Sequence, residues 1–567
     1  MDKIWQLYKP EKDLAAVISQ ELRISPFIAQ ILINRGIKTA SEADAFLNPR
    51  LAQLRDPMEI PNISAAAKRV ILAKERGDKV VVFGDYDVDG VTGTAIMVHT
   101  LKFLGLDVSY YIPHRYGEGY GLSLDSVKKI AESGAGLIIT VDCGIASVAE
   151  IEAANNLDLD VIVTDHHNLP KELPRAYAVV NPKQIAGEHP SKYLSGAGVA
   201  FKFAWALLRT AGIKDSSFLT SLLDLTALGT FSDVVPLTGE NRILAVGGLN
   251  LINEKRRPGI RLLAEEAALN GRISANQIYF CLAPRINAAG RLEHASKSVE
   301  LMLSDDPLQA REMARELNRI NVRRQSIGSS IKEEVFSAID ESYIEANKLI
   351  ILAGENWHPG VIGIVASQVV DAFSRPTVLI GINDGVGRGS ARSIYGLSIY
   401  EVLDTCRDLF LDFGGHEGAA GFEVALENIP ELKRRLKEKV EASVKLEALA
   451  PRINVECEIE PAQITLSLIK EIERIAPFGE GNAAPIFLIR NLSLADHRGV
   501  GKDGKHLKAW FSRDGIDLET IGFNLGSLAK RLDYDRTYDI IFRLESNEFN
   551  GFESAQLSLI DFKEAKR

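Results

Sequence analysis

The sequence predicts a multidomain α/β protein with a parallel-sheet core, a helical connector, a second, smaller α/β domain and a C-terminal β domain. Its 567 residues exceed the roughly 100–200 residues of one domain. Short β-branched runs alternate with helical stretches in two regions, which is typical of parallel sheets covered by helices. After residue 446 the pattern changes to short apolar runs separated by turns, which indicates β structure.

Each region has its own pattern. Residues 1–75 are expected to be helical, with a packing or capping role. Residues 76–240 form the predicted core, and residues 241–345 the helical connector, with a long helix that begins at Asp306-Pro307. Residues 346–445 form the second α/β domain and 446–567 the β domain. The core strands are predicted at Lys79–Gly84, Val108–Ile112, Gly136–Val141, Asp160–Thr164 and Ala178–Asn181.

Composition excludes several classes of protein. The 66 basic and 76 acidic residues give a net charge of −10, so net charge alone cannot attract a polyanion, although a local basic groove could. The four cysteines lie far apart without a C-x-x-C pair, which argues against a disulfide framework or a cysteine-rich zinc site. No apolar run reaches the ~18 residues of a membrane span, and charges interrupt the N-terminus. We expect a cytoplasmic protein without a membrane partner.

Three carboxylates crowd the end of the first predicted core strand, at Asp85, Asp87 and Asp89. Carboxylates this close raise one another's pKa unless a cation lies among them. A polar turn that caps the next helix is the alternative.

Two further strands end in similar residues, Asp142 and Asp165-His166-His167, and Asp233 follows an apolar helical stretch. In a parallel sheet these strand ends share one edge, where ligands bind. Oxygen ligands with imidazole suit Mn²⁺ or Mg²⁺. Their charge favours two ions, which activate water for in-line hydrolysis of a phosphoester. An isolated His166 would more often be a core histidine.

These four motifs, in this order, resemble those of the DHH phosphoesterase superfamily, and within it the bacterial exonucleases specific for single-stranded DNA. The resemblance covers residues 70–565. It implies that Asp87 binds the first metal, that Asp89 and His166 bind the second, that Asp142 bridges both, and that Asp233 completes the metal cage. His167 would face the scissile phosphate, and Asp165 would orient its neighbours.

The sequence departs from the superfamily at Phe83, where many members have a histidine. Asp85 could supply the missing ligand, so the sequence does not decide which residues complete the ligand shell of the first metal.

Three stretches are predicted to hold substrate. The first, Pro284–Leu292, is expected between helical segments, where two arginines and an amide could clamp phosphates or form an interdomain salt bridge. Gly385–Ser393 could form an anion nest, and the glycines of Gly414–Gly421 would expose a histidine on a tight loop; plain β-turns are the alternative. The last two stretches resemble motifs of the domain that follows DHH cores, which implies binding of phosphate or the 5′-terminal nucleotide. The candidate residues are Arg285, Asn287, Arg291, Arg388, Ser390, Arg392, Gly415 and His416.

The C-terminal domain resembles an OB-fold, here an OB-like β-barrel, which binds single strands through a basic groove and stacked aromatic side chains. Core packing is the alternative for each aromatic residue. The candidate contacts are Lys502, Lys505, Lys508 and Trp510, with Trp357 expected to line the substrate cleft.

Together these resemblances imply a 5′→3′ exonuclease of single-stranded DNA that releases 5′-mononucleotides in DNA repair and recombination. A single-strand-binding protein and a helicase are the expected partners. A phosphoesterase for small substrates and a non-catalytic DNA-binding scaffold are the alternatives. The choice between Mn²⁺ and Mg²⁺, activity on RNA, processivity and oligomeric state stay open.

Overall fold

The computed structural model describes residues 3–444, 449–549 and 552–565. The chain divides into two compact units. The larger comprises Gln6–Gly290, His294–Asn318 and Asn454–Arg567, and the smaller comprises Met1–Trp5, Arg291–Glu293 and Arg319–Ile453.

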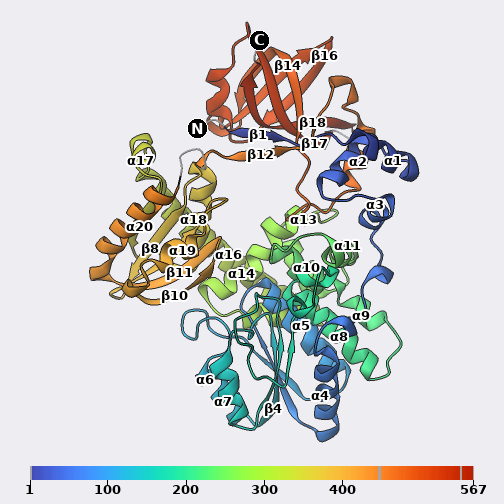
Figure 1. The fold of residues 1–567 in the computed structure, drawn as a ribbon, viewed down its shortest axis with the longest axis vertical. Coiled ribbons are helices and arrows are strands. Elements are labelled where there is room, and N and C mark those ends of the chain that lie inside the picture. Colours follow the sequence, from blue (N-terminus) through green and yellow to red (C-terminus); the bar gives the residue numbers. More distant parts are fainter. Residues whose placement is uncertain (1–2, 445–448, 550–551, 566–567) are drawn as a thin grey trace. The chain divides into compact units, whose positions relative to one another are not determined.

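A five-stranded parallel sheet of order β3-β2-β4-β5-β6 forms the centre of the larger unit, which confirms the predicted core. Helices α6 (Leu124–Glu132) and α7 (Val148–Asn155) cover one face, and α4 (Ile63–Arg76), α5 (Val88–Phe103) and α8 (Gly196–Thr210) cover the other (Figure 1). Because both faces are covered, the three strands β2, β4 and β5 are almost wholly apolar and buried. The strands are β2 Lys79–Gly84, β3 Val108–Tyr111, β4 Ala135–Val141, β5 Asp160–Thr164 and β6 Ala178–Val180.

Helices follow the sheet and extend into the connector, as predicted. The long helix α16 (Pro307–Ser337) begins where expected, because the side chain of Asp306 accepts a hydrogen bond from the Leu308 amide at 2.8 Å. The other helices of this region are α9 Ser217–Ser221, α10 Leu223–Ser232, α11 Gly239–Asn253, α12 Pro258–Glu266, α13 Ala275–Gln277, α14 Ala283–Leu292 and α15 Ser296–Leu303.

The prediction that Pro284–Leu292 lies between helices is wrong. These residues form α14, which continues directly from a π-helical turn at Ile278–Leu282. Pro284 has no amide hydrogen to donate to the preceding turn, and it lies just after this π-helical turn.

The smaller unit contains a five-stranded sheet of order β10-β11-β9-β8-β7, in which only β7 and β8 are parallel. Helix α18 (Pro359–Phe373) packs in one apolar cluster with residues of α16 and of the sheet. Helices α19 (Ile399–Asp404) and α20 (Ile429–Ser443) pack in a second cluster with the sheet. The remaining elements are β7 Ile350–Glu355, β8 Thr377–Asn383, β9 Val386–Arg392, β10 Phe410–His416, β11 Ala419–Ala425 and α17 Glu341–Ala346.

The C-terminal part of the larger unit is the predicted OB-like barrel, closed by pairing between β14 and β17. The N-terminal helices α1 (Lys12–Leu22), α2 (Pro26–Asn34) and α3 (Ala40–Leu47) contribute to the same apolar core as the barrel. The other elements here are β13 Cys457–Glu458, α21 Leu466–Glu473, β14 Phe487–Val500, β15 His506–Arg513, β16 Ile516–Gly522, β17 Thr537–Phe549 and β18 Phe552–Glu564.

The N-terminal strand β1 (Ile4–Leu7) pairs with β12 (Arg452–Val455). In the described parts of the chain no single helix is long and apolar enough to cross a membrane. By length and composition, α1 and α2 would qualify only together, as a pair bent by 118°.

Candidate metal centre

The carboxyl edge of the parallel sheet carries the predicted acidic residues. Asp85, Asp87 and Asp89 follow β2, Asp142 follows β4, and Asp165 follows β5. Asp142 adopts a left-handed conformation with φ 62°, which turns the chain sharply at the end of β4. The sheet therefore brings together carboxylates that are far apart in the sequence.

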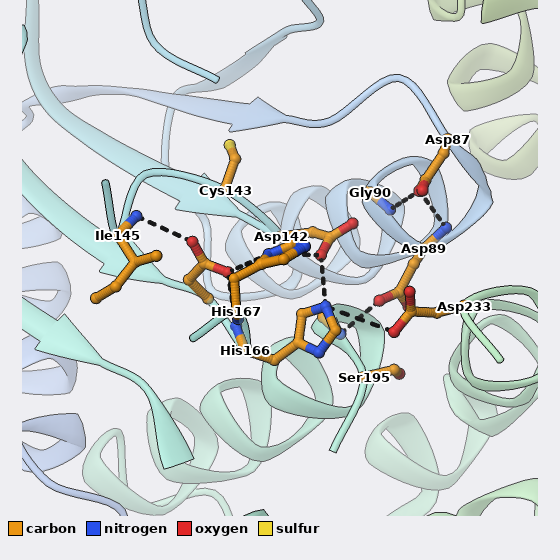
Figure 2. A network of polar contacts seen from close by, with 12 residues as sticks. Asp87, Asp89, Gly90, Asp142, Cys143, Ile145, His166, His167, Ser195 and Asp233 are labelled. Carbon is orange, nitrogen blue, oxygen red and sulfur yellow. Dashed lines mark hydrogen bonds and ion pairs between the residues drawn. The ribbon is translucent and has the colours of Figure 1, made fainter. Parts of the chain in front are cut away.

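His166 lies at the centre of this cluster. Its Nε2 atom is 3.1 Å from Oδ1 of Asp142 and 3.5 Å from Oδ2 of Asp233, which is the residue that follows α10. Figure 2 shows both carboxylates turned toward the His166 ring, with Asp89 beside Asp233. Ligand atoms lie within 4.8 Å of one another in Asp85-Asp87-Asp142, in Asp89-His166-Asp233 and in Asp142-His166-His167.

Asp89 is fixed by a helix that sequence analysis did not connect with the site. Its carboxylate accepts hydrogen bonds from the amides of Gly196 (2.5 Å) and Ala197 (2.9 Å) at the N-terminus of α8, where amides and the helix dipole favour an anion. A side chain at position 196 would lie 2.6 Å from Asp142, so only glycine fits between the two carboxylates. The Ser195-Gly196-Ala197-Gly198 run was the available signal.

Asp87 caps helix α5 through hydrogen bonds from the amides of Asp89 and Gly90, at 2.9 and 3.1 Å. It therefore fulfils the polar-turn alternative and still belongs to the carboxylate group with Asp85 and Asp142. Phe83 is fully buried and stacks on Tyr111, with ring centroids 5.4 Å apart.

The crowding shifts the ionisation of these groups. Burial, followed by the neighbouring carboxylates, raises the pKa of Asp89 to about 7 and that of Asp233 to about 9. The same causes hold the pKa of Asp85 and Asp142 well above the usual carboxyl range. Burial lowers the pKa of His166 to about 3, which keeps its imidazole neutral and able to bind a metal. Without a bound cation, some of these carboxyl groups would stay protonated and uncharged.

Four buried polar atoms of this cluster form no hydrogen bond of normal geometry in the part of the chain that the structure describes, although three of them lie close together. They are Asp85 Oδ1, Asp142 Oδ1, His166 Nε2 and Asp233 Oδ2. Buried polar atoms almost always have a partner, and these four are the donor types that divalent metals bind. The residues therefore fit a divalent-metal centre.

His167 lies beside the cluster with 47% of its side chain exposed. Its Nδ1 is 2.8 Å from Oδ1 of the fully buried Asp165, which also accepts hydrogen bonds from the amides of His166 and His167. Burial alone would lower the pKa of His167, but the hydrogen bond and charge of Asp165 raise it overall. Tyr120, which no sequence pattern marked, donates a hydrogen bond to the Asp142 carbonyl at 3.0 Å and lies 3.2 Å from Nδ1 of His167.

Two predicted phosphate ligands on α14 have partners within the protein. Oδ1 of Asn287 accepts a hydrogen bond from the Val88 amide at 3.1 Å, so this side chain supports the loop that carries the carboxylates. Arg285 donates to the Cys281 carbonyl and to Asn318, at 2.7 and 3.0 Å.

In the smaller unit, three predicted ligands lie against the first two turns of α18. Arg291 donates to the Gly360 carbonyl at 3.2 Å. Arg392 and Ser390 lie over Gly363, where an added Cβ would be 2.8 Å from both side chains. Arg392 also donates to Ser390 Oγ at 3.1 Å. The structure therefore gathers two guanidinium groups and a hydroxyl in one place.

The expected anion nest at Gly385–Ser393 is wrong. Val386–Arg392 form β9, whose backbone pairs with β8 on one side and β11 on the other. Arg388 pairs with Glu423 on β11 at 2.6 Å. Gly415, with φ 148°, packs against the Ala419–Ala420 backbone, and His416 ends β10 as an exposed residue.

Trp357 packs as a core residue. It is 6% exposed, and its indole N–H donates to Glu334 at 2.8 Å. Trp510 instead lies on the outer side of β15, with the guanidinium of Arg498 at 5.1 Å and Nζ of Lys508 at 5.0 Å from its ring centroid. Lys502 and Lys505 are exposed in the turn before β15.

Three parts of the chain match family models: residues 79–230 the DHH family, N-terminal domain, residues 346–442 the DHHA1 domain, and residues 455–561 the RecJ OB domain. Single-stranded-DNA-specific exonuclease RecJ of Bacillus subtilis is 38% identical over 562 residues, which cover 98% of this chain and 70% of that protein. The chain belongs to the RecJ family. RecJ of Escherichia coli is 34% identical over 573 residues, which cover 97% of this chain and 98% of that protein.

Solved RecJ structures also match over the full chain. RecJ from Thermus thermophilus in complex with Mn²⁺ has a TM-score of 0.86 and 32% identity, and the match covers 100% of this chain and 80% of that chain. Its complex with Mg²⁺ has a TM-score of 0.80 and 31% identity, with 100% and 79% covered. The resemblance to the DHH phosphoesterases and to an OB-fold is therefore confirmed.

Proposed function

We propose that this RecJ-family chain is a metal-dependent exonuclease specific for single-stranded DNA. It hydrolyses phosphodiesters from the 5′ end with two divalent ions, Mn²⁺ or Mg²⁺, releases 5′-mononucleotides and serves DNA repair and recombination in the cytoplasm. The observation that carries the proposal is the set of buried oxygen and nitrogen atoms that form no normal hydrogen bond and converge from four separate segments of the chain.

The ligand groups divide between the two ions. Asp85, Asp87 and Asp142 would hold the first, with Asp85 in the place of the histidine that Phe83 replaces. Asp89, His166 and Asp233 would hold the second. Asp142 would contribute to both sites, because it belongs to one group with Asp85 and Asp87 and to another with His166. Bound ions supply positive charge for the phosphate and an activated water for in-line displacement.

His167 is the group placed to act on substrate. Asp165 accepts a hydrogen bond from Nδ1 of His167, which leaves Nε2 of this half-exposed ring to face the scissile phosphate. There it stabilises negative charge or donates a proton to the leaving 3′-oxygen. Asp165 acts through His167 by fixing its tautomer and orientation.

The strand is held by two further surfaces. Arg291, Ser390 and Arg392, with Gly415 and His416 on the same unit, bind the 5′-terminal phosphate through charge-assisted hydrogen bonds. Trp510 stacks on a base farther along the DNA, and the nearby lysines bind the DNA backbone. These lysines are Lys502, Lys505 and Lys508. A single-strand-binding protein and a helicase would deliver the strand.

End-labelled single strands of each polarity, given with Mn²⁺, Mg²⁺ or a chelator, test the proposal. Release of the 5′ label as a mononucleotide, abolished by the chelator, is the expected result, and digestion from the 3′ end alone contradicts the polarity. A dinucleotide degraded much faster than a long strand would instead favour a phosphoesterase for small substrates.

The substitution Asp142→Ala separates the enzyme from a binding scaffold. Hydrolysis should be lost while strand binding is largely kept, because Asp142 belongs to the metal cluster and the basic surfaces are unchanged. The matched control is Asp107→Ala, an exposed aspartate before β3, which should hydrolyse DNA as the wild type does. Undiminished hydrolysis by the Asp142 variant would contradict the proposal.

A further inference from the structure

Lys183 lies on the ligand-bearing edge of the parallel sheet, and the proposed mechanism does not use it. It belongs to a short 3₁₀ turn, Pro182–Gln184, which follows β6. β6 is the strand next to β5, whose end carries Asp165, His166 and His167. The lysine therefore lies beside the loop that carries the proposed catalytic histidine and His166, which would bind the second metal.

Two asparagines fix Lys183 to that loop. The side chain of Asn181, which is fully buried, donates to the His167 carbonyl at 3.0 Å and accepts from the Lys183 amide at 2.9 Å. The Lys183 ammonium donates to Oδ1 of Asn168 at 2.9 Å. The lysine is thus held at both its backbone and its ammonium group, next to the loop that carries the two histidines.

The ammonium group of Lys183 is half-buried close to the carboxylates of the site. Burial lowers the pKa of Lys183, whereas the carboxylates of Asp165 and Asp233 act in the opposite direction, so the ammonium lies within the field of the metal cluster. Among the residues that the structure describes, its one polar partner is the neutral Asn168, and it forms no ion pair with a carboxylate. Two N–H donors of a half-buried cation therefore stay available to an anion.

We infer that Lys183 binds a backbone phosphate of the DNA strand next to the scissile one, on the His167 side of the metal cluster. The inference rests on the proposed function, because it takes its anion from the nucleic-acid substrate. A chain with a net charge of −10 and a carboxylate-rich site repels a polyanion as it approaches, and a braced ammonium at the rim offsets that repulsion where the strand must enter. A fixed charge also sets the position of the phosphate along the strand.

Binding of a short single-stranded oligonucleotide tests the inference. It is measured by fluorescence anisotropy over a series of salt concentrations, with Ca²⁺ in place of the catalytic ions and with recovery of the intact strand checked. For Lys183→Met we expect about tenfold weaker binding, from loss of one charge-assisted contact, and a salt slope shallower by about 0.7, the value for one phosphate of a single strand. Lys183→Arg should restore both. Lys128→Met is the control, since Lys128 is an exposed lysine of α6.

Unchanged affinity and salt slope in Lys183→Met, while the wild type binds and degrades the strand, would overturn the inference and leave the proposed function intact. Tighter Mn²⁺ binding with unchanged DNA binding would also overturn it, because the lysine would then act on the metals. A wild type that neither binds nor degrades the strand would instead refute the proposed function. If Lys183→Met unfolds at lower temperature than the control, Lys183→Gln, which keeps a polar group for Asn168, carries the same comparison.

Discussion

Replacement of Asp165 by asparagine tests whether a buried carboxylate controls the proposed catalytic histidine. Oδ2 of Asp165 accepts from the Ile145 amide at 2.9 Å, and Oδ1 accepts from the amides of His166 and His167 and from His167 Nδ1. All these donors surround one carboxylate, whose own pKa is lowered because the hydrogen bonds and charge of His167 outweigh its burial. The variant keeps the shape and removes the charge.

The orientation of the new amide follows from these contacts. The amide oxygen must take the Oδ1 position, which accepts three hydrogen bonds. The NH₂ group then faces the N–H of Ile145, so two donors oppose each other without an acceptor. One buried unsatisfied donor costs about 1–3 kcal/mol, and the remaining bonds weaken because their acceptor is no longer charged. We expect about 2–4 kcal/mol less stability in total, a loss that a folded protein of this size can tolerate.

The effect on catalysis should be larger than the effect on folding. Turnover on single-stranded DNA should fall by about 10²–10⁴, the range for a displaced acid–base group. Asp165 raises the pKa of His167 in the wild type, so in the variant His167 loses its proton at lower pH. The alkaline limb of the pH–rate profile should shift toward lower pH.

A matched control comes from the other end of the same strand. Asp160 pairs with the buried Arg69 at 2.6 Å, so Asp160→Asn should cost stability and leave turnover unchanged. Comparison of the thermal midpoint, the turnover rate and the pH profile of both variants separates folding from catalysis. Unchanged turnover and an unchanged profile in Asp165→Asn would refute the role given to Asp165.

Three further predictions concern the metals, the tyrosine and the barrel. The pKa of Asp89 is raised to about 7 and that of Asp233 to about 9, so the metal-free protein binds more protons when folded than when unfolded and loses stability as the pH rises from about 4 to about 9. Added Mn²⁺ should therefore raise the thermal unfolding midpoint most near pH 9. An increase in the midpoint that is the same at every pH would contradict this prediction. Tyr120→Phe should lower turnover roughly tenfold with KM unchanged, because His167 and the Asp142 carbonyl lose a partner; a change in KM alone would count against it. Trp510→Ala should weaken binding of long strands by about 1–3 kcal/mol while a dinucleotide is cleaved as before, and equal effects on both would argue against a stacking role.

The candidate metal cluster could be predicted because each of its residues is marked by its immediate neighbours in the sequence. Each carboxylate or imidazole follows a short apolar run, and parallel strands place their ends along one edge. What could not be predicted is the support around it. The contacts of Tyr120, and those of the Gly196 and Ala197 amides with Asp89, join residues more than 20 or 100 positions apart, and no periodicity encodes such pairs.

The glycine-rich stretch of the smaller unit shows why glycine content alone does not predict an anion site. Gly389 has no side chain because the ring of Phe422 occupies that space: an added Cβ would be 2.0 Å from the ring. Gly354 likewise makes room for the indole of Trp357. In both cases the ring of an aromatic residue explains the glycine, and the stretch expected to bind an anion is a packed strand.

The shared apolar core of α1–α3 and the barrel has a consequence for biosynthesis. Ile18 and Leu32 belong to the same cluster as Phe542 and Phe562, which are synthesised long after them. Contacts between residues this far apart in the sequence form late, so helices α1–α3 keep an apolar surface uncovered until the barrel has been translated. A product that stops before the barrel would retain that surface and should aggregate or be degraded.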